Sequence, residues 1–464
     1  MGAGTAQRGA CLLISGKVRK NMEFVVFAGV LLLLFIFMIV QELIQTKNQE
    51  KLFKKYLREN YGKEPPKEYS LERFARLGSY LERHKEEKQL DDITWNDLGM
   101  DEVFRRIDRT YSAAGEEYLY YTLRNISCGR EALEHLEEVV NWLQEQENIK
   151  VRIQLLMKRL GHLGKYSLYD YLDNLDYLGE RSNRKIVLGN LLYLPFLLLL
   201  FVQPAMGTIG IVLCMLWHIM TYFREKKVIE PYIISFAYVL RLIDVCEELE
   251  KQKIPAYRRE LDELREALKS LRELRRGAYW VMAGNQGKIG GNPLDILADY
   301  LRMILHLDIF QFNRMLEKLR KKTGQVENML AITGYLDMAI SVGGFRKSLE
   351  GYCIPKLEED TEKAFLHMKK GWHPLLSQPV KNSIRADRGI LLTGSNASGK
   401  STFLKMVAVN AVLAQTIHTC AAESYHAPIF QIFSSMALRD SMENGESYYI
   451  VEIRSLKRIL DAAG

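Results

Sequence analysis

The sequence predicts a mixed fold: a mainly α-helical core with transmembrane helices, followed by an incomplete α/β domain that carries a phosphate-binding loop. Three observations predict it. Two long stretches, residues 24–40 and 186–223, contain no Asp, Glu, Lys or Arg. In most of the remaining chain apolar residues recur at every third or fourth position, the spacing of helices with one buried face. The segment TGSNASGKST at 393–402 has the spacing of a loop that binds phosphate.

The first uncharged stretch, FVVFAGVLLLLFIFMIV, predicts a transmembrane helix over residues 22–43 that follows a short tail, residues 1–21. Its 17 residues, at about 1.5 Å of helix rise each, cross most of a hydrocarbon core. A cleaved signal peptide is the alternative, with Lys17, Arg19 and Lys20 as its basic start. The length of the apolar run and the lack of a following A-x-A site favour an uncleaved anchor.

The second uncharged stretch predicts a transmembrane hairpin over residues 181–227. It is too long for a single span, and the segment QPAMGT supplies a turn through Pro204 and Gly207. A buried core helix is the alternative, but such a helix should have a polar face, which this stretch lacks. The basic flanks RSNRK and REKK place both ends of the hairpin in the cytoplasm. We therefore expect a multi-pass protein of the cell membrane whose phosphate-binding domain is cytoplasmic.

The remaining helical segments predict one domain that the hairpin interrupts. The segment 130–161 places on one face the apolar residues Leu133, Leu136, Val139, Val140 and Leu143. The heavily charged run 237–276 predicts a solvated long helix or an antiparallel pair. After Gly343 and Gly344, prolines and short β-like runs indicate an α/β domain. The predicted order is a charged helical linker at 44–97, the first part of the helical core at 98–180, its second part at 228–345, and the α/β domain at 346–464.

Cysteine use and net charge exclude some functions and leave others open. The six cysteines form no C-x-x-C pair, which fits a reducing compartment and neither a disulfide framework nor a zinc site. The formal net charge of +7 is modest. It fits membrane orientation and is weak evidence for nucleic-acid binding.

The phosphate-binding loop matches G-x-x-x-x-G-K-[ST], the Walker A pattern, in full. Its predicted context is a buried strand before it, GILLT at 389–393, and an amphipathic helix after it at 401–415. A chance match is the alternative for a pattern of eight residues, and both flanking elements argue against it. The predicted nucleotide-binding residues are Gly394, Ser395, Asn396, Ala397, Ser398, Gly399, Lys400, Ser401 and Thr402.

The chemistry of such a loop predicts ATP and Mg²⁺ as cofactors. Backbone N–H groups surround the β-phosphate, Lys400 bridges the β- and γ-phosphates, and Ser401 is a ligand of Mg²⁺. Hydrolysis also needs an acidic residue for the metal on a neighbouring strand. No apolar run that ends in Asp or Asp-Glu follows Ser401. The catalytic residues therefore stay unknown, and we expect this chain to hydrolyse ATP poorly.

These segments resemble the MutS family of DNA mismatch repair ATPases. The loop is similar to that family's TGPN-x-x-GKST, with Asn396 at the family's asparagine. RDSMENGESYYIVEI at 439–453 is similar to D-D-x-x-x-G-x-S-[TS]-F-x-x-E-M, with Ser441 in place of the second Asp. GWHPLL and VKNSI resemble the R-H-P segment and the V-x-N-D segment near the adenine, except that Trp372 replaces Arg and Ser383 replaces Asp.

The resemblance extends into the helical core and covers roughly residues 100–464 without the hairpin. IDRTYSAAGEEYLYYTL at 107–123 is similar to L-D-x-T-x-T-x-x-G-x-x-x-L-x-x-x-L, and GYLDMAI at 334–340 is similar to L-D-x-L-A. We expect the chain to lack the family's mismatch-reading N-terminal domain, and the apolar pair 186–223 stands where the family has its DNA clamp. The family's D-E strand would follow a few residues after RILDAAG. We therefore expect a sequence truncated before the Walker B strand, with a natural end as the alternative.

The resemblance implies a homodimer in which the serine of G-x-S, here Ser447, reaches the nucleotide of the partner. The alternative role of Ser447 is to cap the helix 447–461. The first functional hypothesis is a membrane-anchored MutS-like ATPase in which ATP-driven dimer closure is coupled to DNA binding in mismatch repair or recombination. The alternative is a DNA-independent mechanochemical ATPase that transmits the nucleotide state to a membrane partner. A transporter of the ABC type is weaker, because L-S-G-G-Q is absent.

Overall fold

The computed structural model describes residues 37, 40, 41, 44–64, 69–86, 89–126, 129–163, 167–275, 300–359, 363–395, 398–436 and 448–463. The chain divides into two units, Met1–Tyr61 and Gly62–Gly464. In the first unit, residues 44–60 form a helix. The predicted transmembrane helix at 22–43 and the tail before it lie almost entirely outside the described residues, so both stay predictions.

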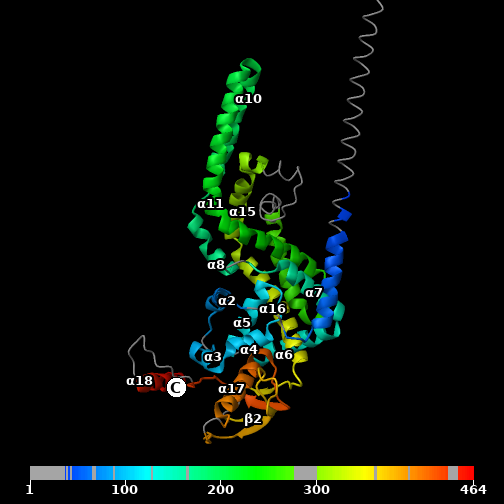
Figure 1. Cartoon of the computed structure of the whole chain (residues 1–464), viewed down its shortest axis with the longest axis vertical. Helices are drawn as coiled ribbons and strands as arrows, with labels where there is room; N and C mark the ends of the chain where they lie inside the picture. Colours follow the sequence, from blue (N-terminus) through cyan, green and yellow to red (C-terminus); the bar gives the residue numbers. More distant parts are fainter. Residues whose placement is uncertain are drawn as a thin grey trace, which may run out of the picture. The chain divides into compact units, whose positions relative to one another are not determined.

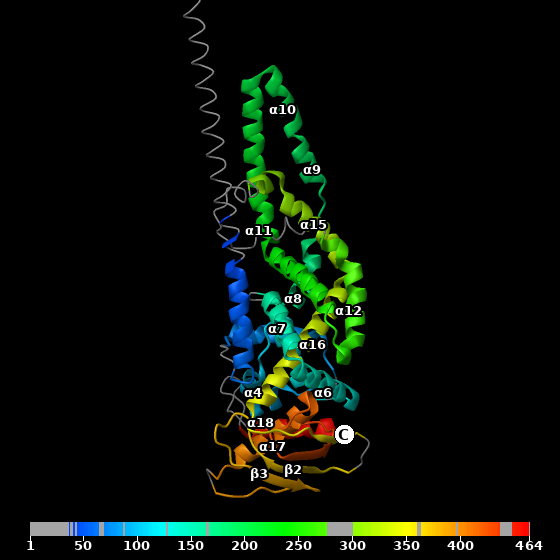
Figure 2. The ribbon, with the colours of Figure 1, turned by 90° about the vertical axis from the view of Figure 1, so that its right-hand side faces the viewer.

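The second unit is mainly helical and carries a small mixed sheet (Figures 1 and 2). Its helices before the sheet are α2 Leu71–Arg83, α3 Asp92–Leu98, α4 Met100–Ile107, α5 Ala113–Arg124, α6 Arg130–Glu145, α7 Glu147–Leu160, α8 Leu168–Asp173, α9 Arg184–Leu191, α10 Tyr193–Val202, α11 Pro204–Glu250, α12 Arg258–Leu271, α15 Leu307–Arg320 and α16 Thr323–Ser348. The short 3₁₀ helices are η1 Asn174–Leu178, η2 Pro255–Tyr257 and η3 Arg272–Arg275. The elements that follow are β1 Lys356–Glu358, β2 Leu366–Gly371, β3 Asn382–Ala386, α17 Lys400–Ile417, β4 Ser424–Pro428 and α18 Tyr448–Ala463.

The helical periodicity of the sequence is confirmed, with one boundary that periodicity did not predict. All five apolar residues of the predicted face at 130–161 are buried on α6. The chain leaves the helix at Gln146 (φ −96°, ψ 66°) and restarts as α7. The charged run 237–276 contains the C-terminal end of α11 and all of α12, joined by a short connection. Of the two predicted arrangements, the helix pair is therefore observed.

The helical core is organised by a close crossing of α5 and α16. A Cβ added at Gly115 would lie 2.4 Å from Oδ2 of Asp337, and one added at Gly334 would lie 2.6 Å from the carbonyl of Ala114. Only glycine permits these distances. The approach lets Asp337 accept hydrogen bonds from the backbone N–H of Ser112 at 2.8 Å and from its hydroxyl at 2.6 Å. The two core segments that resemble the MutS family therefore meet in space.

The sheet has the strand order β1-β4-β2-β3. β1 runs parallel to β4, while β2 is antiparallel to both β4 and β3. Helix α17 packs against β2 and also against α5 and α6 of the helical core. The sheet region is thus joined to the helical core through α17.

Helices α9 and α10 and the first half of α11 form a hairpin whose outer side chains are exposed (Figures 1 and 2). Both α9–α10 (Arg184–Val202) and α11 (Pro204–Glu250) are long and apolar enough to cross a membrane. Length and composition alone are weak evidence, since the core helix of a soluble protein passes the same test. Of the 18 consecutive residues with the highest mean hydropathy in Arg184–Val202, 6% are buried. Of the corresponding residues in α11, 28% are buried.

The turn of the hairpin differs from the predicted one. The chain reverses at Gln203, between α10 and α11, and Gly207 lies inside α11 rather than in the turn. A Cβ on Gly207 would lie 2.6 Å from the backbone nitrogen of Leu200, and one on Gly210 would lie 2.1 Å from the ring of Phe196. These glycines therefore bring the two helices together instead of reversing the chain.

Candidate nucleotide-binding site

The phosphate-binding loop runs directly into helix α17, as predicted. Gly399 precedes the helix with a φ of +86°, a left-handed conformation in which a residue with a Cβ is strained. A Cβ on Gly394 would lie 3.0 Å from the hydroxyl of Ser398. The backbone conformation therefore explains the glycine at 399, while a side chain at 394 would require only that the hydroxyl of Ser398 move slightly. Asn396 and Ala397 lie outside the described residues.

Lys400 bends back over the loop that precedes it. Its Nζ donates to the carbonyls of Gly394 at 2.7 Å and Ser395 at 2.6 Å. Ser401 and Thr402 follow in the first turn of α17 and are exposed. A lysine ammonium group held over the start of the loop, with two exposed hydroxyls at a helix N-terminus, is an arrangement that suits a polyphosphate and its magnesium ion.

The predicted buried strand at 389–393 is wrong. These residues have no regular secondary structure, and Ile390 is 53% exposed and Leu391 88% exposed. A short apolar run becomes a buried strand only when neighbouring strands satisfy its backbone and other elements cover its faces. Among the described residues no strand pairs with 389–393. Of the predicted strand–loop–helix unit, the helix is thus observed and the strand is not.

Asn410 fixes α17 to the segment that contains Trp372. Its Nδ2 donates to the carbonyl of Trp372 at 3.0 Å, and its Oδ1 accepts from the N–H of Ala421 at 2.7 Å. Asn410 is fully buried. Sequence reasoning missed this residue, although a lone amide on the apolar face of a helix is a signal that can be read, because such a group must be hydrogen-bonded.

The segments that resemble the family's nucleotide-binding regions lie beside α17. The Nζ of Lys381 lies 4.7 Å from the ring centroid of Trp372, so a cation–π contact holds the two segments together. His373 is buried, and burial, followed by the charge of Lys405, lowers the pKa of its imidazole. Ser383, at the family's Asp position, accepts a hydrogen bond from the N–H of Lys370 at 2.9 Å.

Arg346, at the end of α16, connects the helical core to α17. Its guanidinium donates to both carboxylate oxygens of Glu137 on α6, at 3.0 and 2.7 Å. It also donates to the hydroxyl of Thr419 at 2.9 Å and to the carbonyl of His418 at 3.0 Å. Burial alone would raise the pKa of Glu137, but hydrogen bonds from His418 and Arg346 lower it to about 2. Periodicity gave no sign of this junction.

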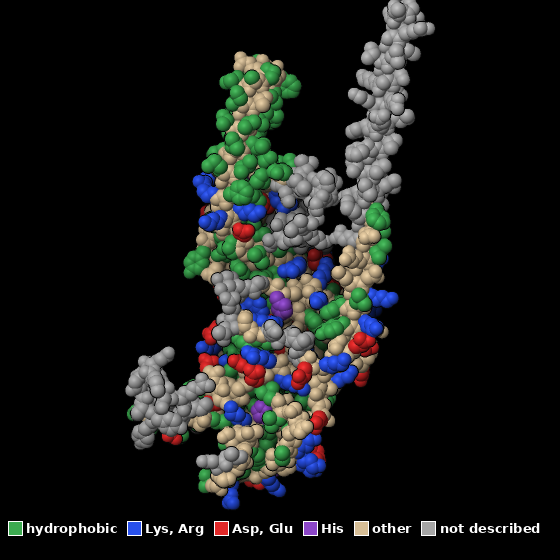
Figure 3. Space-filling view, viewed as in Figure 1, with side chains coloured by type: hydrophobic (Ala, Val, Ile, Leu, Met, Phe, Trp, Pro, Cys, Tyr) green, Lys and Arg blue, Asp and Glu red, His purple; other side chains and the backbone are tan. Residues whose placement is uncertain are grey.

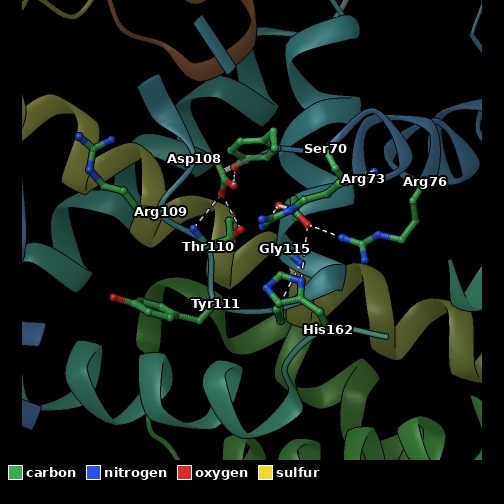
Figure 4. Close-up of polar contacts among 12 residues, drawn as sticks. Ser70, Arg73, Arg76, Asp108, Arg109, Thr110, Tyr111, Gly115 and His162 are labelled. Carbon is green, nitrogen blue, oxygen red and sulfur yellow. Dashed lines mark hydrogen bonds and ion pairs between the residues drawn. The ribbon is translucent and has the colours of Figure 1, made fainter. Parts of the chain in front are cut away.

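A second polar cluster lies in the helical core, around the start of α5 (Figure 4). Oδ1 of Asp108 accepts from the N–H of Thr110 at 2.9 Å and from its hydroxyl at 2.6 Å. Arg73 and Arg76 of α2 point toward the same carboxylate, that of the fully buried Glu116. The cluster neutralises buried charge and ties α2 to α5, which is a structural role.

The neighbouring Glu117 differs, because no arginine is within salt-bridge distance of it among the described residues. Its carboxylate accepts from the hydroxyl of Ser167 at 2.8 Å. Burial raises the pKa of Glu117 to about 8, against the opposing effect of the Ser167 hydrogen bond. No group of three or more His, Cys, Asp or Glu side chains within the described ranges could hold a metal ion.

The segment that resembles the second family motif is described only at its end. Ser447 lies outside the described residues, as do residues 437–446 before it. Helix α18 begins at Tyr448, close to the predicted helix 447–461, and its Glu452 is exposed. Arg458 of α18 donates to Asp91 at 2.5 Å. The predicted contact of Ser447 with a partner's nucleotide stays a prediction.

Comparison with known proteins relates the chain to MutS over about a third of its length. A family model described as MutS domain V matches residues 390–464. The DNA mismatch repair protein MutS of Leptospira interrogans is 30% identical over 171 residues, which is 34% of this chain and 20% of that protein. MutS of Pseudothermotoga lettingae is 27% identical over 157 residues (32% and 19%), and that of Acholeplasma laidlawii is 32% identical over 148 residues (31% and 17%).

The chain thus spans about a fifth of the length of these curated relatives. The similarity includes the phosphate-binding loop and α17, whose geometry is described above. A MutS ATPase domain implies nucleotide binding, which agrees with the predicted cofactor at family level. The chain therefore carries a MutS-like ATPase domain with distant similarity to the DNA mismatch repair protein MutS.

Proposed function

We propose that the chain is a MutS-like ATP-binding protein that couples the nucleotide state of the 394–402 loop to a helical hairpin inserted in a membrane. The observation that carries the proposal is the loop itself, where Lys400 closes over Gly394 and Ser395 in front of a helix that begins after a left-handed glycine. A phosphate would compete with these two carbonyls for the ammonium group and release Lys400 from them.

A continuous path of contacts supports coupling between the loop and the hairpin. Helix α11 has 47 residues, about 70 Å at 1.5 Å per residue, and leads from the hairpin into the core. There Sγ of Cys246 lies 3.4 Å from the hydroxyl of Thr333 on α16. Helix α16 ends at the Arg346 junction with α17, whose first residue is Lys400. A shift of α17 on nucleotide binding would therefore act directly on α16 and α11.

Membrane insertion is supported by the surface of the hairpin. Large apolar side chains are exposed along both of its helices, for example Phe201 at 88% and Met220 at 74%, and Figure 3 shows such side chains over this part of the surface. Soluble proteins rarely expose a continuous apolar surface of this kind. Lys and Arg side chains gather where the apolar surface ends, as at the cytoplasmic end of membrane spans.

Coupling to DNA is the second candidate, favoured by the similarity to DNA mismatch repair proteins. The charges of α12 weigh against it. Arg259 pairs with Glu263 at 3.4 Å, Arg265 with Glu250 and Asp262 at 2.8 Å each, and Lys269 with Glu266 at 2.7 Å. The acidic partners reduce the positive field that a phosphate backbone would meet at α12. The DNA-independent function therefore fits the described part of the chain better.

Binding of a fluorescent ATP analogue in the presence of Mg²⁺ tests the site. The proposal expects saturable binding by the full chain and its loss in Lys400→Ala, while the exposed Lys321→Ala, between α15 and α16, binds as before. Retention of affinity by Lys400→Ala contradicts the assignment.

Crosslinking with and without Mg-ATP tests the homodimer. Ser447→Ala should weaken the ATP-dependent crosslink if that serine reaches the partner's nucleotide.

DNA titrations separate the two candidates. DNA coupling predicts an affinity that falls steeply between low and physiological salt and changes with ATP. The DNA-independent function predicts neither dependence. Co-flotation of the protein with vesicles tests membrane insertion separately.

A further inference from the structure

A cavity lies at the base of the hairpin, where its apolar surface gives way to charged residues. It has a volume of about 430 Å³, within the range of about 300–1,000 Å³ of small-ligand pockets. Its wall is formed by η1, by the segment that leads into α9, by the middle of α11 and by the start of α15. The cavity therefore lies where the proposed membrane-inserted hairpin meets the helical core.

The wall carries more basic than acidic groups. Arg181, Lys185 and Arg224 are basic, whereas Glu180 and Glu225 are acidic. Arg181 donates from Nη2 to Oε2 of Glu225 at 2.5 Å, which neutralises one charge of each sign. Lys185 and Arg224 are exposed at the cavity. A net positive field thus remains to attract an anion.

The wall also contains buried polar atoms whose hydrogen bonds are not satisfied. Nη1 of Arg181 is a buried donor without a partner among the described residues, and Oδ1 of Asn313 is a buried acceptor without one. Asn313 itself is 7% exposed and is fixed by the bond from its Nδ2 to Oδ1 of Asn183 at 2.9 Å. A buried polar atom without a partner is costly, so a ligand or water is expected to supply one.

Two features point to a ligand that comes from the membrane. Trp217 lines the cavity from α11 and Tyr177 from η1, and these are the residue types enriched where a membrane meets water. The apolar surface of the hairpin begins at the same place, since Trp217 is 51% exposed and Met220, one turn away, is 74% exposed. A ligand with an apolar part could therefore lie along the hairpin while its polar part enters the cavity.

We propose that this cavity binds the headgroup phosphate of an anionic phospholipid. The phosphate accepts hydrogen bonds from Nη1 of Arg181 and is attracted by the charges of Lys185 and Arg224, while a headgroup hydroxyl donates to Oδ1 of Asn313. Basic pockets at the cytoplasmic end of membrane helices bind lipid headgroups in this way. The proposal rests on the proposed insertion of the hairpin. If it is correct, the base of the hairpin binds a specific class of lipid in addition to anchoring the protein in the membrane.

The experiment uses the full chain purified in detergent, phosphatidylglycerol as the anionic probe and phosphatidylcholine as the neutral one. Native mass spectrometry measures lipid adducts over a titration of each lipid. We expect a preference for phosphatidylglycerol that falls about 10- to 30-fold in the double variant Lys185→Gln/Arg224→Gln, because each removed charge weakens attraction to an anionic lipid about three- to fivefold. The matched control Arg152→Gln/Arg272→Gln removes the same charge away from the cavity and should keep the preference.

The outcomes separate the lipid site from the membrane insertion on which it rests. Co-flotation with phosphatidylcholine vesicles, together with equal affinity for both lipids, would overturn the site and leave the insertion standing. Failure to float with any vesicle would overturn the insertion and the site with it. Displacement of phosphatidylglycerol by millimolar inorganic phosphate would identify a free anion as the ligand and overturn the lipid assignment. A loss of preference in the control variant would also contradict the site.

Discussion

Replacement of Arg346 by methionine should loosen α17 from the helical core. Methionine keeps much of the apolar stem of the side chain and removes all the hydrogen bonds that the guanidinium makes to Glu137, Thr419 and the carbonyl of His418. Arg346 is 1% exposed, so water cannot replace the lost donors. Of the side chains that contact the carboxylate of Glu137, the imidazole of His418 and the amide of Asn141 then remain, at 3.4 and 2.9 Å.

The magnitude follows from two observations. Loss of one partner of a buried ion pair costs about 3–5 kcal/mol. Hydrogen bonds from His418, Arg346 and Asn141 together lower the pKa of Glu137 from 4.5 to about 2. The shift corresponds to about 2–3 kcal/mol after a discount for partial exposure, which is an upper limit for the contribution of Arg346. We therefore expect about 3 kcal/mol. Because the folded pKa is the lower one, this stabilisation is present above pH 4.5 and is lost as the pH falls toward 2.

Hydrogen exchange followed by mass spectrometry measures the effect locally. A loss of about 3 kcal/mol lowers the protection of amides in the last turns of α17 about 100-fold, in peptides that cover residues 406–419. The control Arg105→Met breaks an exposed pair with Glu102 at 3.0 Å, worth about 0–1 kcal/mol, and should leave α17 protected. In a double-mutant cycle Arg346→Met and Glu137→Gln should be strongly non-additive. Unchanged protection of α17, or additive effects, would refute the reasoning.

Three further predictions concern the site and the core. Gly399→Ala forces a residue with a Cβ to a φ of +86° and should lower the free energy of unfolding by about 1–2 kcal/mol. Binding of the ATP analogue should also weaken. An unchanged affinity together with an unchanged urea midpoint contradicts this prediction. Asn410→Leu leaves the carbonyl of Trp372 and the N–H of Ala421 without a partner and should cost about 2–4 kcal/mol, read as a lower urea midpoint. The control Asn328→Leu, at an exposed position of α16, should have little effect. Glu117 has a pKa of about 8 in the folded protein, so its ionisation lowers stability as the pH rises from 4.5 to above 8. Glu117→Gln should therefore be more stable than the original protein by about 3–5 kcal/mol at pH 9 and equally stable near pH 4. A stability difference that does not change with pH would exclude the role of this ionisation.

The helices could be predicted because their signal is local. Leu133 and Leu143 face the same side of α6 whatever surrounds that helix, and a buried stripe follows from the spacing alone. The loop at 394–402 is similar, since Gly399 and Lys400 mark both a backbone conformation and the start of α17. In these cases the residues that carry the pattern are also the residues that form the structure.

Features that depend on partners distant in the sequence could not be predicted. The apolar run at 389–393 reads as a buried strand, yet a strand needs neighbours, and none pairs with it in the described chain. In the sequence, Arg346 is one of many basic residues near the end of a predicted helix. Only the packing of α6 and α17 around it buries its guanidinium and gives it partners on both. Gly207 reads as part of a turn, and its close approach to Leu200 appears only once both helices are placed.

The junctions along α11 and α16 bear on why a phosphate-binding loop and an exposed apolar hairpin occur in one chain. A helix transmits displacement over its length only if its contacts have few alternative arrangements. Helix α16 meets this condition at the glycine crossing with α5, where no side chain can be added, and again at Arg346, which is bonded both to Glu137 on α6 and to the segment that directly follows α17. Since α11 packs against the same helix and continues into the hairpin, movement of α17 cannot be absorbed locally without breaking buried hydrogen bonds. Under the proposed function the expected response is a concerted shift of α16 and α11. Hydrogen exchange in the hairpin that changes with Mg-ATP in the original protein, but not in Arg346→Met, is the signature of such a shift, and the same response in both proteins would contradict it.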